Sequence, residues 1–311
     1  MKTIVLFVAA GLLATLPLVS HAKIVRVVEK SFPAQPGEWL TVETQGGDIR
    51  VEVWDQSTVK VVATQTIKTD SESEADELLK RLTLTIGQTA EGVAAKAQYE
   101  KKRMGFRSGP NVQVSFVVSV PARYNAKLNT SGGNVGVGDL DGKLNVHTSG
   151  GNIELGKIKG DLDAHTSGGD VRLVEGAGSV KLATSGGNIS VQRAAGVTDL
   201  KTSGGDIRIG AADNLIRAST SGGNVTADLI GPLKADCVLE TSGGNVRVHV
   251  SSDAAFQLDA STGGGRVRAD SLSLSSHEIQ RERSRLSGKV NGGGPLLKLH
   301  SSGGDIVVET K

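Results

Sequence analysis

The 311-residue sequence has little cysteine, few aromatic side chains and almost no net charge, and each shortage disfavours a class of structure or partner. A single cysteine, Cys237, excludes a disulfide within the chain, so packing and backbone pairing must stabilise the fold. Two Trp, two Tyr and five Phe are few for a large core, while 41 glycines indicate many tight turns and small core side chains. A formal net charge of +2 gives no reason to expect a nucleic-acid partner.

Long hydrophobic runs are also missing, except at the start of the chain. Residues 4–19 form an apolar stretch between Lys2 and the sequence Ser-His-Ala at 20–22, which is the pattern of a cleaved signal peptide. Gly11 and Pro17 interrupt this stretch, which is no longer than the roughly 20 residues that span a bilayer, so a retained anchor is disfavoured. We predict a signal peptide at 1–22, no transmembrane segment in the mature chain, and export to the periplasm, the cell surface or the medium.

The rest of the chain repeats the hexapeptide Thr-Ser-Gly-Gly-Asn/Asp-Val/Ile. The first six copies of the main series are 18 residues apart, and a fixed period of this kind is the signature of a solenoid. Close copies begin at Thr130, Thr148, Thr166, Thr184, Thr202, Thr220 and Thr241, and looser copies at Thr44, Thr262 and Ser301.

Apolar residues alternate on both sides of each hexapeptide, as with Val135 and Val137 after one copy and Leu144 and Val146 before the next. This alternation predicts two β-strands per period. Glycines such as Gly160 recur between the two strands, which we interpret as a second corner where the backbone takes positive φ. We therefore predict an all-β fold: a single-stranded parallel β-helix, or solenoid, that is right-handed and has rungs of about 18 residues.

Three domains are predicted along the chain. The signal peptide is followed by a less regular, β-rich region at 23–129 that caps the solenoid, and by the repeat solenoid at 130–311, with a loop insertion near 271–288. The sequence from Ser71 to Glu74 resembles a capping box and predicts a short helix over 72–81 in the cap. The final strand, 306–309, is expected to leave an open edge, through which copies of the chain would associate edge to edge.

The sequence from Val120 to Asn129, the hexapeptide series that follows it, and the glycines at 292–294 before Ser-Ser-Gly-Gly-Asp-Ile resemble the DUF4097 family. These are bacterial exported proteins with β-strand repeats that are described as adhesins. The resemblance covers nearly all of the mature chain. It implies a single-stranded β-helix, an exported location and an adhesin-like role, and it brings no catalytic residues.

Enzymes that act on polysaccharides, both lyases and hydrolases, also occur among parallel β-helices and are the alternative function. Their sites need clustered carboxylates. The outward positions before successive repeat threonines instead alternate in charge, which predicts a ladder of paired side chains with no catalytic or cofactor-binding residue. This column reads Asn145, Asp163, Lys181, Asp199 and Arg217.

Metal binding is not predicted either. His147 and His165 occupy equivalent positions one rung apart, but two ligands without a third make a poor site. The Asn and Asp residues of the hexapeptide are better explained by hydrogen bonding at a corner. Cys237 falls in an inward column and is expected to be a buried, small apolar side chain.

A second outward column contains arginine repeatedly, at Arg172, Arg208, Arg247 and Arg268. We expect Arg247 and Arg268 to be close neighbours, and like charges on neighbouring strands are unfavourable without an anionic partner. Together with Arg266 they form a candidate surface for an anionic ligand, with a solvated face as the alternative. The predicted function is a non-enzymatic binding or structural module of the cell envelope, with an envelope or surface component such as an anionic glycan as its partner.

Overall fold

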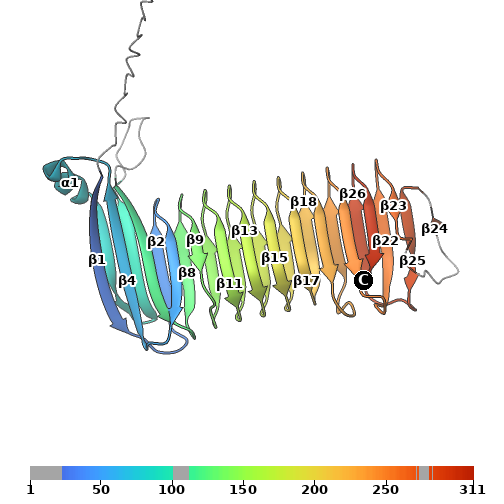
Figure 1. Cartoon of the computed structure of the whole chain (residues 1–311), viewed down its shortest axis with the longest axis horizontal. Helices are drawn as coiled ribbons and strands as arrows, with labels where there is room; N and C mark the ends of the chain where they lie inside the picture. The colour runs from blue at the N-terminus through green and yellow to red at the C-terminus, as the bar shows by residue number, and fades with distance from the viewer. Residues whose placement is uncertain (1–22, 101–111, 271, 273–279, 282) are drawn as a thin grey trace, which may run out of the picture.

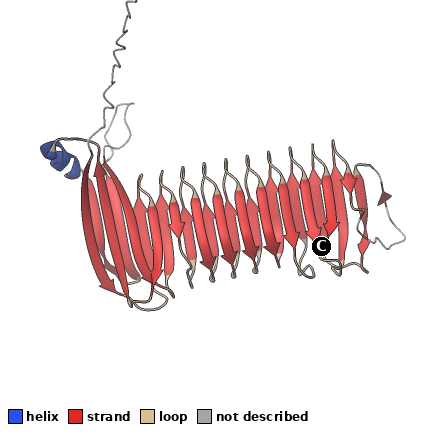
Figure 2. Ribbon diagram, viewed as in Figure 1, coloured by secondary structure: helices blue, strands red, loops and turns tan. Residues whose placement is uncertain are grey.

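A computed structural model describes residues 23–100, 112–270, 272, 280–281 and 283–311. The predicted signal peptide and much of the predicted loop insertion, at 271, 273–279 and 282, lie outside the described residues. Two long β-sheets face each other along a rod, with one helix at the N-terminal end (Figures 1 and 2). None of the described helices is long and apolar enough to cross a membrane.

The two sheets are called sheet A and sheet B. In spatial order, the 13 strands of sheet A are β1 (Ile24–Pro33), β4 (Thr58–Ile67), β7 (Val112–Pro121), β3 (Ile49–Trp54), β9 (Val135–Val137), β11 (Ile153–Ile158), β13 (Val171–Gly176), β15 (Ile189–Ala194), β17 (Ile207–Ala212), β19 (Val225–Leu229), β21 (Val246–Val250), β27 (Ile306–Thr310) and β23 (Val267–Arg268). In the same way, the 14 strands of sheet B are β24 (Gln280–Arg281), β25 (Arg285–Val290), β22 (Phe256–Thr262), β26 (Leu296–Ser301), β20 (Cys237–Thr241), β18 (Leu215–Thr220), β16 (Thr198–Lys201), β14 (Val180–Ala183), β12 (Leu162–His165), β10 (Leu144–His147), β8 (Asn125–Thr130), β2 (Trp39–Thr44), β6 (Gly92–Tyr99) and β5 (Leu82–Thr89).

Each repeat period forms one rung, with one strand in each sheet. Leu144 lies opposite Leu162, which lies opposite Val180, so equivalent positions of successive rungs are in register and the strands are parallel. Val135, Val137, Leu144 and Val146 are all buried, as are their equivalents in later rungs except the half-buried Val267 of the outermost rung, and they form one continuous core between the sheets. The predicted parallel β-solenoid with 18-residue rungs is confirmed.

The N-terminal region contributes rungs to the stack in addition to closing its end. β2 and β3 lie directly beside β8 and β9, with Thr44 opposite Thr130, and β6 and β7 stack outside them. β1, β4 and β5 then finish this end in antiparallel pairing. The 13 strands of sheet A have 12 gaps between them, which at about 4.8 Å each extend the stack to about 58 Å.

The predicted helix is confirmed as α1 (Glu72–Leu79). The Ser71 side chain caps it by accepting a hydrogen bond from the backbone N–H of Glu74. Arg26 of β1 pairs with both Glu72 and Asp76, at 2.9 Å and 2.7 Å, and so ties the helix to the first strand of sheet A.

At the C-terminal end, the last rung in sequence is not the last in space. β26 and β27 lie between the β20–β21 rung and the β22–β23 rung, so that Ile306 is opposite Val246 on one side and Val267 on the other. The prediction that the final strand leaves an open edge is therefore wrong, because β27 has a partner on both sides. The chain first makes the outer rung and then returns to fill the inner one. β25, part of which lies in the predicted loop insertion, pairs antiparallel with β22.

The corner glycines are needed for a reason other than the one predicted. Positive φ among the described glycines occurs only at Gly37, Gly92, Gly231, Gly292 and Gly293, all outside the regular corners. At the regular corners the backbone of one rung lies directly on that of the preceding rung. A Cβ on Gly151 would lie 1.9 Å from the carbonyl oxygen of Gly133, and one on Gly160 would lie 2.3 Å from that of Gly142.

This close approach predicts different costs for the two glycines of one pair. A Cβ on Gly150 meets its nearest atom, the Gly132 carbonyl oxygen, at 3.6 Å, an ordinary contact. We expect Gly151→Ala to destabilise the protein by at least ~2 kcal/mol, as overpacking does, and Gly150→Ala to be close to neutral. Thermal unfolding of the two variants measures the difference. Equal melting temperatures would contradict direct backbone stacking.

Cys237 is fully buried on β20, as predicted. Burial raises the pKa of its thiol to about 12, so both access and thiolate formation are suppressed in the folded protein. We expect a thiol reagent at pH 8 to label Cys237 only after denaturation. Mass spectrometry of labelled native and unfolded samples tests this, and rapid labelling of the native protein would contradict the inward position.

Candidate binding surface

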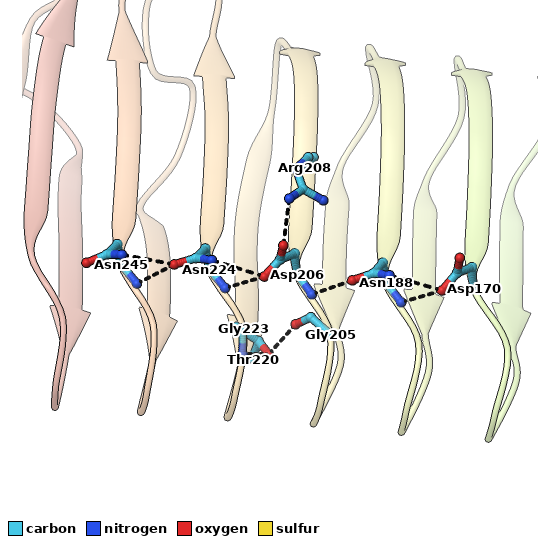
Figure 3. Close-up of polar contacts among 9 residues, drawn as sticks. All are labelled: Asp170, Asn188, Gly205, Asp206, Arg208, Thr220, Gly223, Asn224 and Asn245. Carbon is cyan, nitrogen blue, oxygen red and sulfur yellow. Dashed lines mark hydrogen bonds and ion pairs between the residues drawn. The ribbon is translucent and has the colours of Figure 1, made fainter.

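The repeat threonine joins each rung to its neighbour from inside the corner. Its hydroxyl donates to a glycine carbonyl of the adjacent rung, at 2.6–2.9 Å in all nine copies from Thr130 onward. The same oxygen accepts the N–H of the second glycine of its own hexapeptide, as Thr220 does from Gly223 (Figure 3). Serine keeps both bonds at Ser301. The hydroxyl therefore satisfies backbone groups that the tight corner would otherwise leave unpaired.

The Asn and Asp residues of the hexapeptide form a second ladder on the outside of the same corner. Each side-chain Oδ1 accepts the backbone N–H of the equivalent residue in the next rung, at 2.7–2.9 Å, from Asp48 through to Arg266. Figure 3 shows this ladder from Asp170 to Asn245. The predicted corner hydrogen bonding is confirmed, and acidic members are separated by neutral asparagine, which keeps carboxylates from facing each other on adjacent rungs.

These ladders keep successive rungs in register, so the outward side chains of sheet A lie in columns along the rod. The column nearest the corner ladder is called the arginine column. Following the sheet register, arginines alternate with uncharged residues over its second half. The column reads Arg50, Gly136, Glu154, Arg172, Ser190, Arg208, Thr226, Arg247, Val307 and Arg268.

Three arginines of the arginine column pair with an aspartate of the corner ladder. Arg172 lies 2.8 Å from Asp170, and Arg208 lies 2.6 Å from Asp206 two residues earlier in the chain. Arg268 reaches across to Asp305 of the neighbouring rung, also at 2.6 Å. The corner ladder thus neutralises most of the positive charge that the sequence places in this column.

Arg247 differs because the corner residue two positions before it is Asn245. Its side chain is exposed and forms no ion pair within the described part of the chain. Arg247 and Arg268 are not adjacent, contrary to prediction, because the inserted rung places Val307 between them. Arg266 is exposed at the corner of the outermost rung, where its backbone N–H ends the ladder on Asp305.

Arg247 and Arg268 nevertheless line one open hollow of about 470 Å³ over Val307. Asp270 and Glu309 line the same hollow, so it has charges of both signs. The sequence reasoning missed these carboxylates, because Glu309 reaches this place only through the insertion of the final rung. The predicted surface is therefore divided between a hollow, with Arg247 and Arg268, and the corner beside it, with Arg266.

A polar cluster next to the hollow was not predicted at all. His249 of β21 lies with Nδ1 2.5 Å from Asp228 Oδ1 and Nε2 3.1 Å from Glu309 Oε2, and Lys311 also contacts Asp228. Burial raises the pKa of Asp228, but hydrogen bonds from Lys311 and His249 outweigh it and leave the pKa below its usual value. Asp228 and His249 come from rungs that are successive in sequence, whereas Glu309 and Lys311 join them only because the final rung inserts beside β21.

On sheet B, the predicted register of the charge ladder is confirmed, but its pairing only in part, because Arg217 pairs with Glu240 outside the column and not with Asp199. Asn145, Asp163, Lys181, Asp199 and Arg217 lie opposite one another on successive strands. Lys181 lies 4.0 Å from Asp163, while Arg217 pairs with Glu240 at 3.0 Å. The imidazole rings of His147 and His165 stack with centroids 5.3 Å apart and planes 10° from parallel.

The corner ladder predicts a pH dependence at Asp206. Its pKa is lowered, mainly by the backbone N–H of Asn224 and further by Arg208, which outweigh the effect of burial. A carboxyl with a lower pKa in the folded state stabilises the fold above its unfolded pKa, near 4, and that stabilisation is lost as the pH falls through the folded value.

We therefore expect Asp206→Asn, which keeps the Oδ1 acceptor, to be less stable than the unaltered protein at pH 7 and to approach it below pH 4. Chemical unfolding at several pH values measures the difference between the two proteins. A difference that does not change with pH would show that the charge of Asp206 contributes nothing.

Solved structures of several bacterial proteins are similar to this chain. A putative adhesin from Parabacteroides distasonis is 13% identical, with 91% of this chain and 97% of that chain covered and a TM-score of 0.45. A putative adhesin from Bacteroides fragilis is 11% identical, with 92% and 97% covered and a TM-score of 0.38. A putative lipid binding protein from P. distasonis is 12% identical, with 91% and 96% covered and a TM-score of 0.36.

No curated protein matches the sequence. The family described as Toastrack DUF4097 matches residues 40–309, which is most of the chain and includes every hexapeptide. The protein therefore belongs to the Toastrack DUF4097 family.

Proposed function

We propose that this protein is a non-enzymatic, adhesin-like binding module of the bacterial cell envelope that binds an anionic glycan at Arg247, Arg266 and Arg268. The uncompensated charge of Arg247 carries the proposal. Asp170 and Asp206 neutralise Arg172 and Arg208, two residues after them, whereas Asn245 has no charge with which to neutralise Arg247. An acidic group of a ligand would take the place of the missing aspartate.

The surroundings of Arg247 support binding of an extended polymer. The hollow over Val307 opens on the flat outer face of sheet A, and the exposed Arg266 lies at its corner side. Glu309 and Asp270 in the hollow would repel acidic groups placed beside them, so an acidic glycan would place one carboxylate at Arg247 and its hydroxyls beside Glu309 and Asp270. The ladders on both sides of the corner keep these groups at fixed separations, which lowers the entropy cost of binding.

The proposed location outside the cytoplasm rests on the signal-peptide pattern of residues 1–22. The sheet B ladder supports the non-enzymatic role, since Lys181 separates Asp163 from Asp199 and leaves no carboxylate pair there to share a proton. The alternative of a polysaccharide-acting enzyme gains no comparable support from the described residues.

Two variants test the role of Arg247. Arg247→Gln removes the charge, and Asn245→Asp supplies an aspartate that would pair with Arg247 in the way Asp206 pairs with Arg208. Because Asn245→Asp also places a carboxylate beside Asp305 of the next rung, its melting temperature is measured first, and only a folded variant is compared. We expect each to weaken binding to polygalacturonate about 5- to 10-fold, because a phosphate- or carboxylate-type contact to an exposed arginine contributes roughly 1 kcal/mol. Surface plasmon resonance at low and high salt provides the measurement.

Arg208→Gln is the matched control, because it changes net charge by the same amount at an arginine that Asp206 already neutralises. It should bind polygalacturonate nearly as the unaltered protein does. Neither the unaltered protein nor any variant should bind neutral dextran through this surface. Equal loss of binding in Arg208→Gln and Arg247→Gln would mean that only net charge matters, and would overturn the proposed site.

A further inference from the structure

The arginine column is interrupted at Gly136, near the other end of the rod. Gly136 lies on β9 between Arg50 of β3 and Glu154 of β11. The guanidinium and the carboxylate therefore stand on strands two spacings apart, about 9.6 Å, with no side chain between them. This place is about six strand spacings, or 29 Å, from Arg247.

The fold does not require glycine at this position. A Cβ built on Gly136 meets nothing within 4 Å, and its φ lies outside the positive region. This differs from Gly156 in the neighbouring rung, where a Cβ would lie 2.5 Å from Asp139. Glycine in a strand weakens the strand. Gly136 therefore lowers stability although packing does not require a glycine there.

An open hollow of about 490 Å³ lies on the outer face of sheet A where this side chain is missing. Arg50 and Glu52 form one wall, and Glu154 and Arg172 form the other. Each arginine is near a glutamate of its own wall, at 4.0 Å for Arg50 and 3.7 Å for Arg172. The charged side chains that line the hollow are thus two arginines and two glutamates, although Arg172 also pairs with Asp170 of the corner ladder outside it, and Val174, which is 38% exposed, adds an apolar surface.

We propose that this hollow is a binding site for a neutral saccharide. Arg50 is a donor only and Glu154 is an acceptor only, and both line the hollow from the strands on either side of Gly136. Neighbouring hydroxyls of a sugar ring both donate and accept, so one pair of hydroxyls satisfies both side chains at once. The apolar patch at Val174 suits the C–H face of the ring.

The charge balance argues against other ligand classes. An anion would meet Glu52 and Glu154 as well as the arginines, and a cation would meet Arg50 and Arg172. This distinguishes the hollow at Gly136 from the Arg247 surface, where one arginine is uncompensated. The saccharide site is independent of the proposed anionic-glycan surface, and the two can fail separately.

Filling the hollow tests the proposal without disturbing the fold. Gly136→Leu places a side chain over the floor, and because the position is open its melting temperature should equal or exceed that of the unaltered protein. Thr226→Leu adds the same side chain to the same column on β19, away from the hollow, and is the matched control. Glu154→Ala removes the acceptor wall.

The probes are cellotetraose, xylotetraose, mannotetraose and chitotetraose, each titrated into the purified protein and followed by amide chemical shifts in NMR. We expect at least one to shift amides of β9 and β11, with affinity reduced at least 10-fold in Gly136→Leu and Glu154→Ala. Thr226→Leu and Arg247→Gln should bind it as the unaltered protein does.

Three results would overturn the site. One is the absence of shifts at β9 and β11 with all four saccharides. Another is unchanged affinity in a folded Gly136→Leu variant. The third is tighter binding of galacturonate, or of an extended neutral peptide, at these strands than of any of the four saccharides.

Discussion

Direct stacking of backbone on backbone at the Gly-Gly corner is the constraint on which the rest of this structure depends. The second glycine of each pair lies so close to the carbonyl oxygen of the preceding rung that no Cβ fits, as at Gly151. The threonine hydroxyl and the Asn or Asp side chain then satisfy the backbone groups on the two sides of the corner. A chain with one cysteine and few aromatic residues is stabilised by repeating this corner rather than by a large aromatic core.

Because the corner repeats with little variation, it also fixes the spacing of side chains on the outer faces of the sheets. Equivalent side chains are held in columns at strand spacing, and charges within a column tend to be neutralised by a neighbour, as Asp206 neutralises Arg208. Departures from that rule are therefore informative. Asn245 leaves Arg247 without a carboxylate, and Gly136 removes a side chain that the fold would accept. Both proposed sites lie where the column departs from its own pattern.

The order of the rungs in space also determines which side chains become neighbours on the outer faces. Because β27 inserts between β21 and β23, Val307 separates Arg247 from Arg268, and Glu309 joins His249 and Asp228 in one column. The same insertion removes the open edge that the end of the sequence suggested. At the other end, β2 and β3 enter the stack next to the first regular rung, although β4 to β7 separate them from it in sequence.

The sequence by itself determined the solenoid, its period, most of the inward residues, the helix at α1 and the corner hydrogen bonding; where a bulge shifts the register, Leu215 points inward in place of Ile216, which the alternation predicts. These depend on contacts within one rung or between rungs adjacent in sequence, where an 18-residue period places equivalent residues in register. Only the tertiary structure decided the order of the rungs at both ends, because near-identical corners can stack on one another in more than one order. It also decided why the corner glycines are needed. A glycine that is required by close backbone contact between rungs looks the same in sequence as a glycine that is required by positive φ.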